Sequence, residues 1–139
     1  MNIVLDTNVL LVSISPKSKF NWVFQKFIDE EYTLCVTTDI LQEYEEIIGK
    51  HMGVEAANFV LQIIESAVNV NYITNYFKWN LITIDPDDNK FVDCAVSCNA
   101  RFIVTHDKHF NILKKIEFPK IEVVGIEYFR STFNKIEEE

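Results

Sequence analysis

Four acidic residues stand where a carboxylate cluster would need them: Asp6, Glu43, Asp88 and Asp107. Asp6 directly follows an apolar run at residues 3–5, and Asp107 closely follows a second apolar run at residues 102–104. In open α/β sheets, ligands bind at the carboxyl ends of strands, so we expect these two carboxylates at one edge of a sheet. Carboxylates gathered in this way repel each other and either hold raised pKa values or bind cations.

Helical geometry adds a third carboxylate and leaves the choice of the fourth open. Asp88 lies near the middle of the inward face of its helix, one turn before Phe91 begins the apolar part. Glu43 falls at one margin of the apolar face of another helix, and Glu45 falls at the opposite margin. Asp93 is expected to point outward, so it is not predicted to be a ligand.

The residue types favour Mg²⁺ or Mn²⁺ rather than zinc. Carboxylate oxygens are hard ligands that suit these two ions. His106 and His109 lack the paired spacing of most zinc sites, and the three cysteines are expected to be buried free thiols. One or two divalent ions held by carboxylates activate water and stabilise the leaving oxygen in phosphodiester hydrolysis, so a nuclease is indicated.

Alternating strands and helices must position these residues. We predict core strands over residues 2–5, 34–36, 102–104 and 121–124, and a strand or edge segment over 70–73. We predict helices over residues 19–30, from a cap at 37–39 to Gly49 or Gly53, and over 54–68, 88–99, 107–115 and 126–134. This alternation indicates an α/β fold, with a parallel sheet covered on both faces.

The bulk properties predict one domain. A chain of 139 residues is close to the usual domain size, and we assign residues 1–135 to the domain and 136–139 to an acidic tail. We find no secretory leader and no apolar run of ~18 residues, so we expect a cytoplasmic protein with no membrane partner. The net charge of −8 is unusual for a protein that holds nucleic acid, and bound cations or a basic partner would offset it.

Four segments of the chain resemble the motifs of PIN-domain ribonucleases. These segments are residues 3–10, 38–44, 85–91 and 103–110, and their order and spacing match over nearly the whole chain. The closest branch is the toxins of toxin–antitoxin systems related to VapC. The resemblance implies a three-layer α/β/α PIN-like fold with a parallel sheet of four or five strands.

The same resemblance assigns roles to individual residues. It makes Asp6, Glu43, Asp88 and Asp107 the catalytic, metal-binding carboxylates, and so selects Glu43 over Glu45. Asn8 and Thr105 would orient Asp6 and Asp107. His106 falls at a position that varies in the family and is given no catalytic role. Asn99 stands where the family commonly has glycine, but asparagine tolerates the left-handed backbone that such a helix end requires.

The function implied by the resemblance is a metal-dependent endoribonuclease that uses Mg²⁺ or Mn²⁺ to hydrolyse RNA, acting as the toxin of a toxin–antitoxin pair. An RNA substrate and an antitoxin are the implied partners, and a homodimer fits because such toxins are often dimeric. Which lysines contact RNA stays open among Lys17, Lys19, Lys50, Lys108, Lys114 and Lys115.

Two other functions compete with this one. A catalytically silent PIN-fold interaction module would use the acidic surface to bind a basic partner. An aspartate-based phosphatase or receiver domain also places Asp after strands. The phosphatase pattern, however, needs a carboxylate where Asn8 stands, and the receiver pattern needs an aspartate where Thr37 and Thr38 follow a strand.

Overall fold

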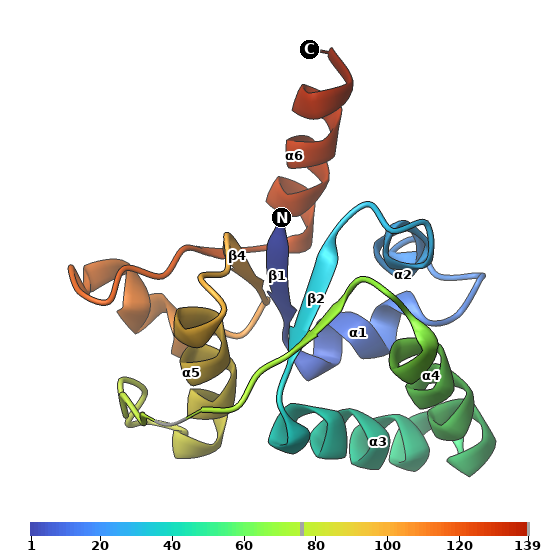
Figure 1. Ribbon diagram of the computed structural model, residues 1–139, viewed down its shortest axis with the longest axis horizontal. Coiled ribbons are helices and arrows are strands. Elements are labelled where there is room, and N and C mark those ends of the chain that lie inside the picture. Colours follow the sequence, from blue (N-terminus) through green and yellow to red (C-terminus); the bar gives the residue numbers. More distant parts are fainter. Residues whose placement is uncertain (76, 139) are drawn as a thin grey trace.

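A computed structural model describes residues 1–75 and 77–138, with side chains up to residue 134 (Figure 1). The strands are β1 (Asn2–Leu5), β2 (Thr33–Val36), β3 (Val70–Tyr72), β4 (Phe102–Val104) and β5 (Val123–Val124). The α-helices are α1 (Thr7–Ser13), α2 (Asn21–Ile28), α3 (Thr38–Met52), α4 (Val54–Ser66), α5 (Asn89–Ser97) and α6 (Ile126–Glu138). Two 3₁₀ segments are η1 (Pro86–Asp88) and η2 (Lys108–Lys115).

The strands form one parallel sheet in the order β3-β2-β1-β4-β5. The chain builds outward from β1 to β2 and β3, then returns to place β4 on the other side of β1. In the register, Leu5 lies opposite Val104, so β1 and β4 end side by side. This reversal of strand order between β1 and β4 is the position where open α/β sheets bind their ligands.

Helices cover the sheet on both faces, as predicted for a three-layer α/β/α fold. Helix α5 packs against β1, β2 and β4, while α3 packs against α1 and α4. Right-handed crossovers from β1 through β2 to β3 are expected to place α1 to α4 on one face, and the return to β4 is expected to place α5 on the other. Figure 1 shows α5 beside β1 and β4, with α1 to α4 gathered on the side of β2.

A ring cluster joins α6 to α2 and β2. The ring of Phe129 lies 5.3 Å from that of Tyr32 and 5.7 Å from that of Trp22. Phe133 also packs against Phe129, at 5.1 Å between ring centroids. The contact buries the apolar faces of both helices far from the carboxyl end of β1, so this part of the molecule is structural.

Three local signals position the elements as expected. The side chain of Thr37 accepts a hydrogen bond from the backbone N–H of Ile40 and so caps the start of α3. Gly53, with φ at 98°, ends α3 and opens α4. Asn99 has φ at 52°, which is the left-handed turn expected of it after α5.

Other elements differ from the prediction. Helix α1 was not predicted: its Thr, Asn and Val residues are weak helix formers, and the carbonyl of Asp6 starts it by accepting from the N–H groups of Val9 and Leu10. The segment after Asp107 is a 3₁₀ helix, and β5 is shorter than residues 121–124. Helix α6 runs to Glu138, into the expected tail, and Glu139 lies outside the described residues.

Asp93 corrects one sequence-based expectation. It is only 5% exposed, and its Oδ1 accepts a hydrogen bond of 3.1 Å from the backbone N–H of Trp79. Asp93 was expected to face solvent because it lies opposite the sheet, but the segment around Trp79 covers that side of α5. Burial accordingly raises the pKa of Asp93, and its contact serves to hold this segment on α5.

In the part of the chain that the structure describes, none of the helices combines the length and the apolar character that crossing a membrane requires.

Candidate metal centre

The carboxyl ends of β1 and β4 bring Asp6 and Asp107 together. Asp6 follows β1 directly, and its N–H donates to the carbonyl of Val104 at the end of β4. Thr105 follows β4, and its hydroxyl donates to Oδ2 of Asp6 at 2.7 Å. The same Thr105 oxygen accepts from the backbone N–H of Asp107 at 3.0 Å. Thr105 therefore fixes both neighbours, one through its carboxylate and the other through its backbone.

Asp6 is a buried carboxylate, with 7% of its surface exposed. Burial raises its pKa above the ordinary value, while the hydrogen bonds from Thr105 and from the Thr7 backbone lower it. The negative charges of Asp107 and Glu43 raise it further. A bound cation would relieve this repulsion.

Asp88 lies where η1 meets α5, and its side chain is 14% exposed. Among the described residues, no hydrogen-bond donor reaches its buried Oδ2 atom. Burial, followed by the charges of Asp85, Asp107 and Asp6, raises the pKa of Asp88 to about 6. The neighbouring Nδ1 of His109 lies 3.5 Å from this oxygen, beyond a normal hydrogen bond, and lowers the pKa of Asp88 only in part. A buried carboxylate oxygen without a hydrogen bond costs free energy, so this atom can accept a further ligand.

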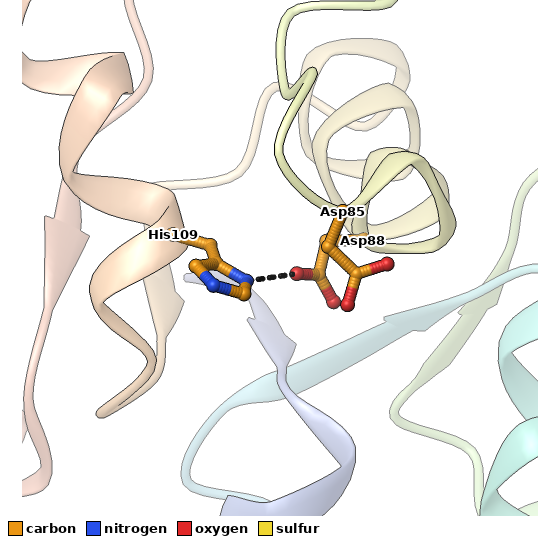
Figure 2. Close-up of side chains that lie close together, drawn as sticks. All are labelled: Asp85, Asp88 and His109. Atoms are coloured by element: carbon orange, nitrogen blue, oxygen red, sulfur yellow. Dashed lines mark ion pairs between the residues drawn. The ribbon is translucent and has the colours of Figure 1, made fainter.

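His109 lies beside Asp88 (Figure 2). Its Nδ1 is 3.5 Å from Oδ2 of Asp88 and 3.5 Å from Oδ1 of Asp107, and it is also buried without a hydrogen-bond partner in the described structure. The backbone N–H of His109 donates to Oδ1 of Asp107 at 2.9 Å. Asp85, Asp88 and His109 each offer one ligand atom, and these atoms lie within 4.8 Å of one another.

Glu43 projects from α3 with its carboxylate already engaged. Its Oε1 lies 2.7 Å from Nζ of Lys90, and its Oε2 accepts a hydrogen bond from the hydroxyl of Thr7. Its charge acts on Asp6, which places it at the border of the same site. Glu45 is exposed on α3.

Asn8 does not reach the residue it was expected to orient. Its side chain is exposed on α1, and it forms no hydrogen bond with another described residue. A helix turns its side chains by 100° per residue, and in α1 this turn directs Thr7 rather than Asn8 toward the site. The hydroxyl of Thr7 holds Glu43, as described above.

His106 makes a structural contact at the end of β4. The backbone N–H of Ile126 donates to its Nε2 at 3.2 Å. Its ring packs on Gly125, where an added Cβ would lie 3.3 Å from the ring. This contact joins the end of β4 to the start of α6.

The residues present fit a divalent cation. Asp6, Asp88 and Asp107 offer hard oxygen ligands, and the charges of Asp6 and Asp107 both act on Asp88. The ligand atoms that already lie within 4.8 Å of one another in the described residues are those of Asp85, Asp88 and His109, so Asp6 and Asp107 would have to close on an ion held there. The unpartnered Oδ2 of Asp88 and the raised pKa values of Asp6 and Asp88 are what an incompletely compensated cation site would show.

A groove beside Glu43 lies between α3 and the start of α5, and Asp6, Asp88 and Asp107 are not among its lining residues. It is lined by Glu43, Lys90 and Asp87, by other residues of α3, and by residues 73–75, Lys78 and Asn80. Lys50 and Lys78 also line it, but carboxylates outnumber lysines among its lining residues. Of the six lysines left open as RNA contacts, Lys50 is the one on this groove.

Sequence reasoning missed four residues at the site: Thr7, Asp85, Lys90 and His109. Lys90 and Asp85 lie inside the motif at residues 85–91. Nothing in the helical pattern, however, shows that Lys90 reaches across to α3. The sequence suggests His109 only as a partner of His106 in a zinc site. Its place two residues after Asp107 does not put it on the same side, because a 3₁₀ helix repeats every three residues.

The chain is similar to one family of known proteins. The family model described as PIN domain matches residues 2–109. No curated protein matches the chain significantly. The family match does not favour an aspartate-based phosphatase or receiver domain.

Solved structures share the fold. The VapBC2 structure from Rickettsia felis, bound to a DNA fragment from its promoter, aligns with a TM-score of 0.63 and 18% identity over 90% of this chain and 98% of that one. DNA-bound VapBC from Salmonella typhimurium aligns with a TM-score of 0.60 and 15% identity over 91% and 98%. The sarcin–ricin loop cleaving toxin VapC20 of Mycobacterium tuberculosis gives a TM-score of 0.58 and 10% identity over 78% and 92%. At these identities the likeness concerns the fold.

Proposed function

Since the chain belongs to the PIN domain family, we propose that it is a metal-dependent endoribonuclease that hydrolyses RNA phosphodiester bonds. The observation that carries the proposal is the buried, unpartnered Oδ2 of Asp88, set among other carboxylates at the point where the strand order reverses. Asp6, Asp88 and Asp107 would hold Mg²⁺ or Mn²⁺, with Glu43 at the border of the same site.

When bound, the divalent ion would lower the pKa of an attacking water and stabilise negative charge on the phosphate. The residues of the chain prepare the ligands for it. Thr105 holds one oxygen of Asp6, and the N–H of His109 holds one oxygen of Asp107. Ligands fixed in this way bind a metal with little reorganisation, and removing such a partner usually weakens metal binding about 10- to 100-fold.

Cleavage of RNA by the purified protein tests this proposal. Structured and unstructured RNAs are incubated with Mn²⁺, Mg²⁺ or EDTA, beside Asp6→Asn and the control Glu65→Gln, an exposed position on α4 away from the groove. We expect metal-dependent cutting that Asp6→Asn abolishes and Glu65→Gln leaves unchanged. Equal cutting by Asp6→Asn and the parent would show the assignment to be wrong. Absence of metal binding would favour the catalytically silent interaction module.

We also propose that the chain is the toxin of a toxin–antitoxin pair. The support is the family and the shared fold with VapC chains, two of which were solved as DNA-bound VapBC complexes. Induced expression of the wild-type chain should arrest the growth of its host, and Asp6→Asn should not. Arrest by both variants would separate toxicity from cleavage and contradict the proposal.

We propose an antitoxin protein and a second copy of the chain as its partners in this role. The excess of carboxylates along the groove beside Glu43 and Lys90 suits a basic segment of such an antitoxin. Sedimentation of the chain alone and with the protein encoded next to its gene would measure both associations. A chain that stays monomeric and ignores that neighbour would contradict them.

A further inference from the structure

Lys90 is a largely buried ammonium at the border of the carboxylate site. Its side chain is 15% exposed, and Nζ lies 2.7 Å from Oε1 of Glu43 and 3.0 Å from Oδ1 of Asp87. Partial burial alone would lower the pKa of Lys90, but its hydrogen bonds to these two carboxylates raise it above the ordinary value. These two contacts hold Lys90 as an ammonium beside Glu43.

The two oxygens of Glu43 are both in use. Lys90 contacts Oε1, and the hydroxyl of Thr7 donates to Oε2. The contrast with Asp88 is direct, because its Oδ2 is buried and has no hydrogen-bond partner in the described structure. The carboxylate oxygen without a hydrogen bond therefore belongs to Asp88, where Nδ1 of His109 lies 3.5 Å away. Both oxygens of Glu43 are engaged, and the ammonium of Lys90 is the positive charge beside it.

Charge balance supports the same division. Glu43 acts on Asp6 with its negative charge, so the two carboxylates belong to one electrostatic unit. The positive charge of Lys90 acts on Glu43 at 2.7 Å and on the exposed Asp87 at 3.0 Å, and the shorter contact is to the less exposed carboxylate of Glu43. The carboxylates of Asp6, Asp88 and Asp107 are then left for a single divalent ion, and a second ion would have to displace Lys90.

We propose that Lys90 supplies the positive charge beside Glu43 that a second metal ion would otherwise supply, so that this chain binds one divalent cation. Glu43 then acts as a positioning residue for Lys90 rather than as a metal ligand. This inference rests on the proposed function, because it assumes that Asp6, Asp88 and Asp107 hold a metal.

The number of Mn²⁺ ions bound by the full chain tests the inference. Calorimetric titration, with free Mn²⁺ followed by electron paramagnetic resonance, should give one ion for the wild type. Lys90→Met removes the charge at nearly constant length and should allow a second ion to bind. Lys90→Arg keeps the charge and should stay at one ion. Lys50→Met, on the same groove, is the control for removing a lysine at a distance and should also stay at one.

Glu43→Gln gives a second, independent measurement. If Glu43 only positions Lys90, the variant should keep its single ion with nearly unchanged affinity. Asp88→Asn should weaken binding by at least about tenfold. Circular dichroism and thermal melts establish that each variant is folded. If Lys90→Met does not fold, the wild-type and Glu43→Gln titrations decide the question.

The outcomes separate the two proposals. Two ions bound by the wild type, or loss of the ion in Glu43→Gln, would overturn the role given to Lys90 and leave the metal-dependent nuclease standing. One ion in Lys90→Met would also overturn that role. No ion bound by the wild type would overturn both proposals.

Discussion

At the scale of the residue, Asp88 couples the site to stability. Its folded-state pKa of about 6 lies above its ordinary value of 3.8, so between these values the folded protein holds a proton that the unfolded chain has released. The stabilisation from that proton is present below pH 3.8 and is lost as the pH rises through 6. The metal-free wild type should therefore lose stability over this window.

Asp88→Asn should remove this pH-dependent loss of stability, because an amide does not ionise. In EDTA at pH 7.5, its melting temperature should exceed that of the wild type, and the difference should shrink as the pH falls toward 4. Mn²⁺ should raise the melting temperature of the wild type more than that of Asp88→Asn, because a ligand stabilises the state that binds it in proportion to its affinity. Asp29→Asn, at an exposed position on the end of α2, is the control. A lower melting temperature for metal-free Asp88→Asn would contradict the electrostatic argument.

Thr105 offers a second prediction at this scale. Its hydroxyl serves Oδ2 of Asp6 and the N–H of Asp107, so Thr105→Val leaves two polar groups without their partner. We expect a loss of about 1–3 kcal/mol in the free energy of unfolding. Mn²⁺ affinity should fall about tenfold or more. Urea unfolding and calorimetry measure the two effects.

Thr105→Ser provides the matched control, since it keeps the hydroxyl and removes a methyl group. It should retain most of the metal affinity. If Thr105→Ser and Thr105→Val lost the same affinity, packing rather than the hydrogen bond would explain the effect.

The site could be predicted from the sequence only where chain position decides geometry. Asp6 and Asp107 follow buried strands, so the edge they occupy is fixed by the direction of β1 and β4. Thr7 and Lys90 act across elements, on a side chain of α3, and no periodicity within one element reveals such a contact. Among the described residues, the side chain that holds the Asp6 carboxylate is that of Thr105 rather than that of Asn8.

At the scale of the element, α3 is tied to the end of β1. The hydroxyl of Tyr44, which is fully buried, donates to the carbonyl of Leu5 at 2.6 Å. This bond joins the residue before Asp6 to the residue after Glu43. It sets how close the two carboxylates lie, because both neighbours are held by one contact.

Tyr44→Phe should remove this tie without leaving a cavity. We expect the free energy of unfolding to fall by about 1–2 kcal/mol, as measured by urea denaturation. Tyr72→Phe, on the exposed edge strand β3, is the matched control and should have little effect. If the two variants lost equal stability, the buried hydrogen bond would not contribute as argued.

The elements were predictable to different degrees for physical reasons. Thr37 and Asn99 act through local backbone geometry, so their roles in capping α3 and ending α5 could be predicted from residue type. Helix α1 has weak helix formers and depends on packing against α2 and α3, so its sequence alone does not predict a helix. Asp93 looked exposed because the covering segment around Trp79 is held by tertiary contacts.

At the scale of the whole molecule, the candidate metal site lies within the residues that match the family, whereas α6 lies outside them and contributes to stability. The ring cluster around Phe129 joins α6 to α2 and β2, although α6 lies beyond the matched residues 2–109. Phe129 is fully buried, so Phe129→Ala should destabilise the fold by about 3–5 kcal/mol. Saturating Mn²⁺ should restore part of this loss in thermal melts, since metal binds the folded state.

Exposed Phe59→Ala on α4 controls for the loss of an aromatic ring and should leave the melting temperature nearly unchanged. A variant of Phe129 as stable as the wild type would show that α6 is dispensable for the sheet.

The net charge of −8 predicts an unusual salt dependence for RNA cleavage. Proteins that hold nucleic acid through many lysine and arginine contacts lose affinity steeply as salt rises, because releasing counterions from the nucleic acid then contributes less free energy to binding. Here the groove beside the site carries more carboxylates than lysines, so its long-range field repels RNA. Salt screens that repulsion over ~10 Å at 0.1 M while the short contacts to the metal persist.

At saturating Mn²⁺, kcat/KM should therefore stay level or rise between about 20 and 150 mM KCl. A steep fall over the same range would show that RNA approaches through a basic face elsewhere on the chain, and charge-removing variants of Lys108, Lys114 and Lys115 would then locate it.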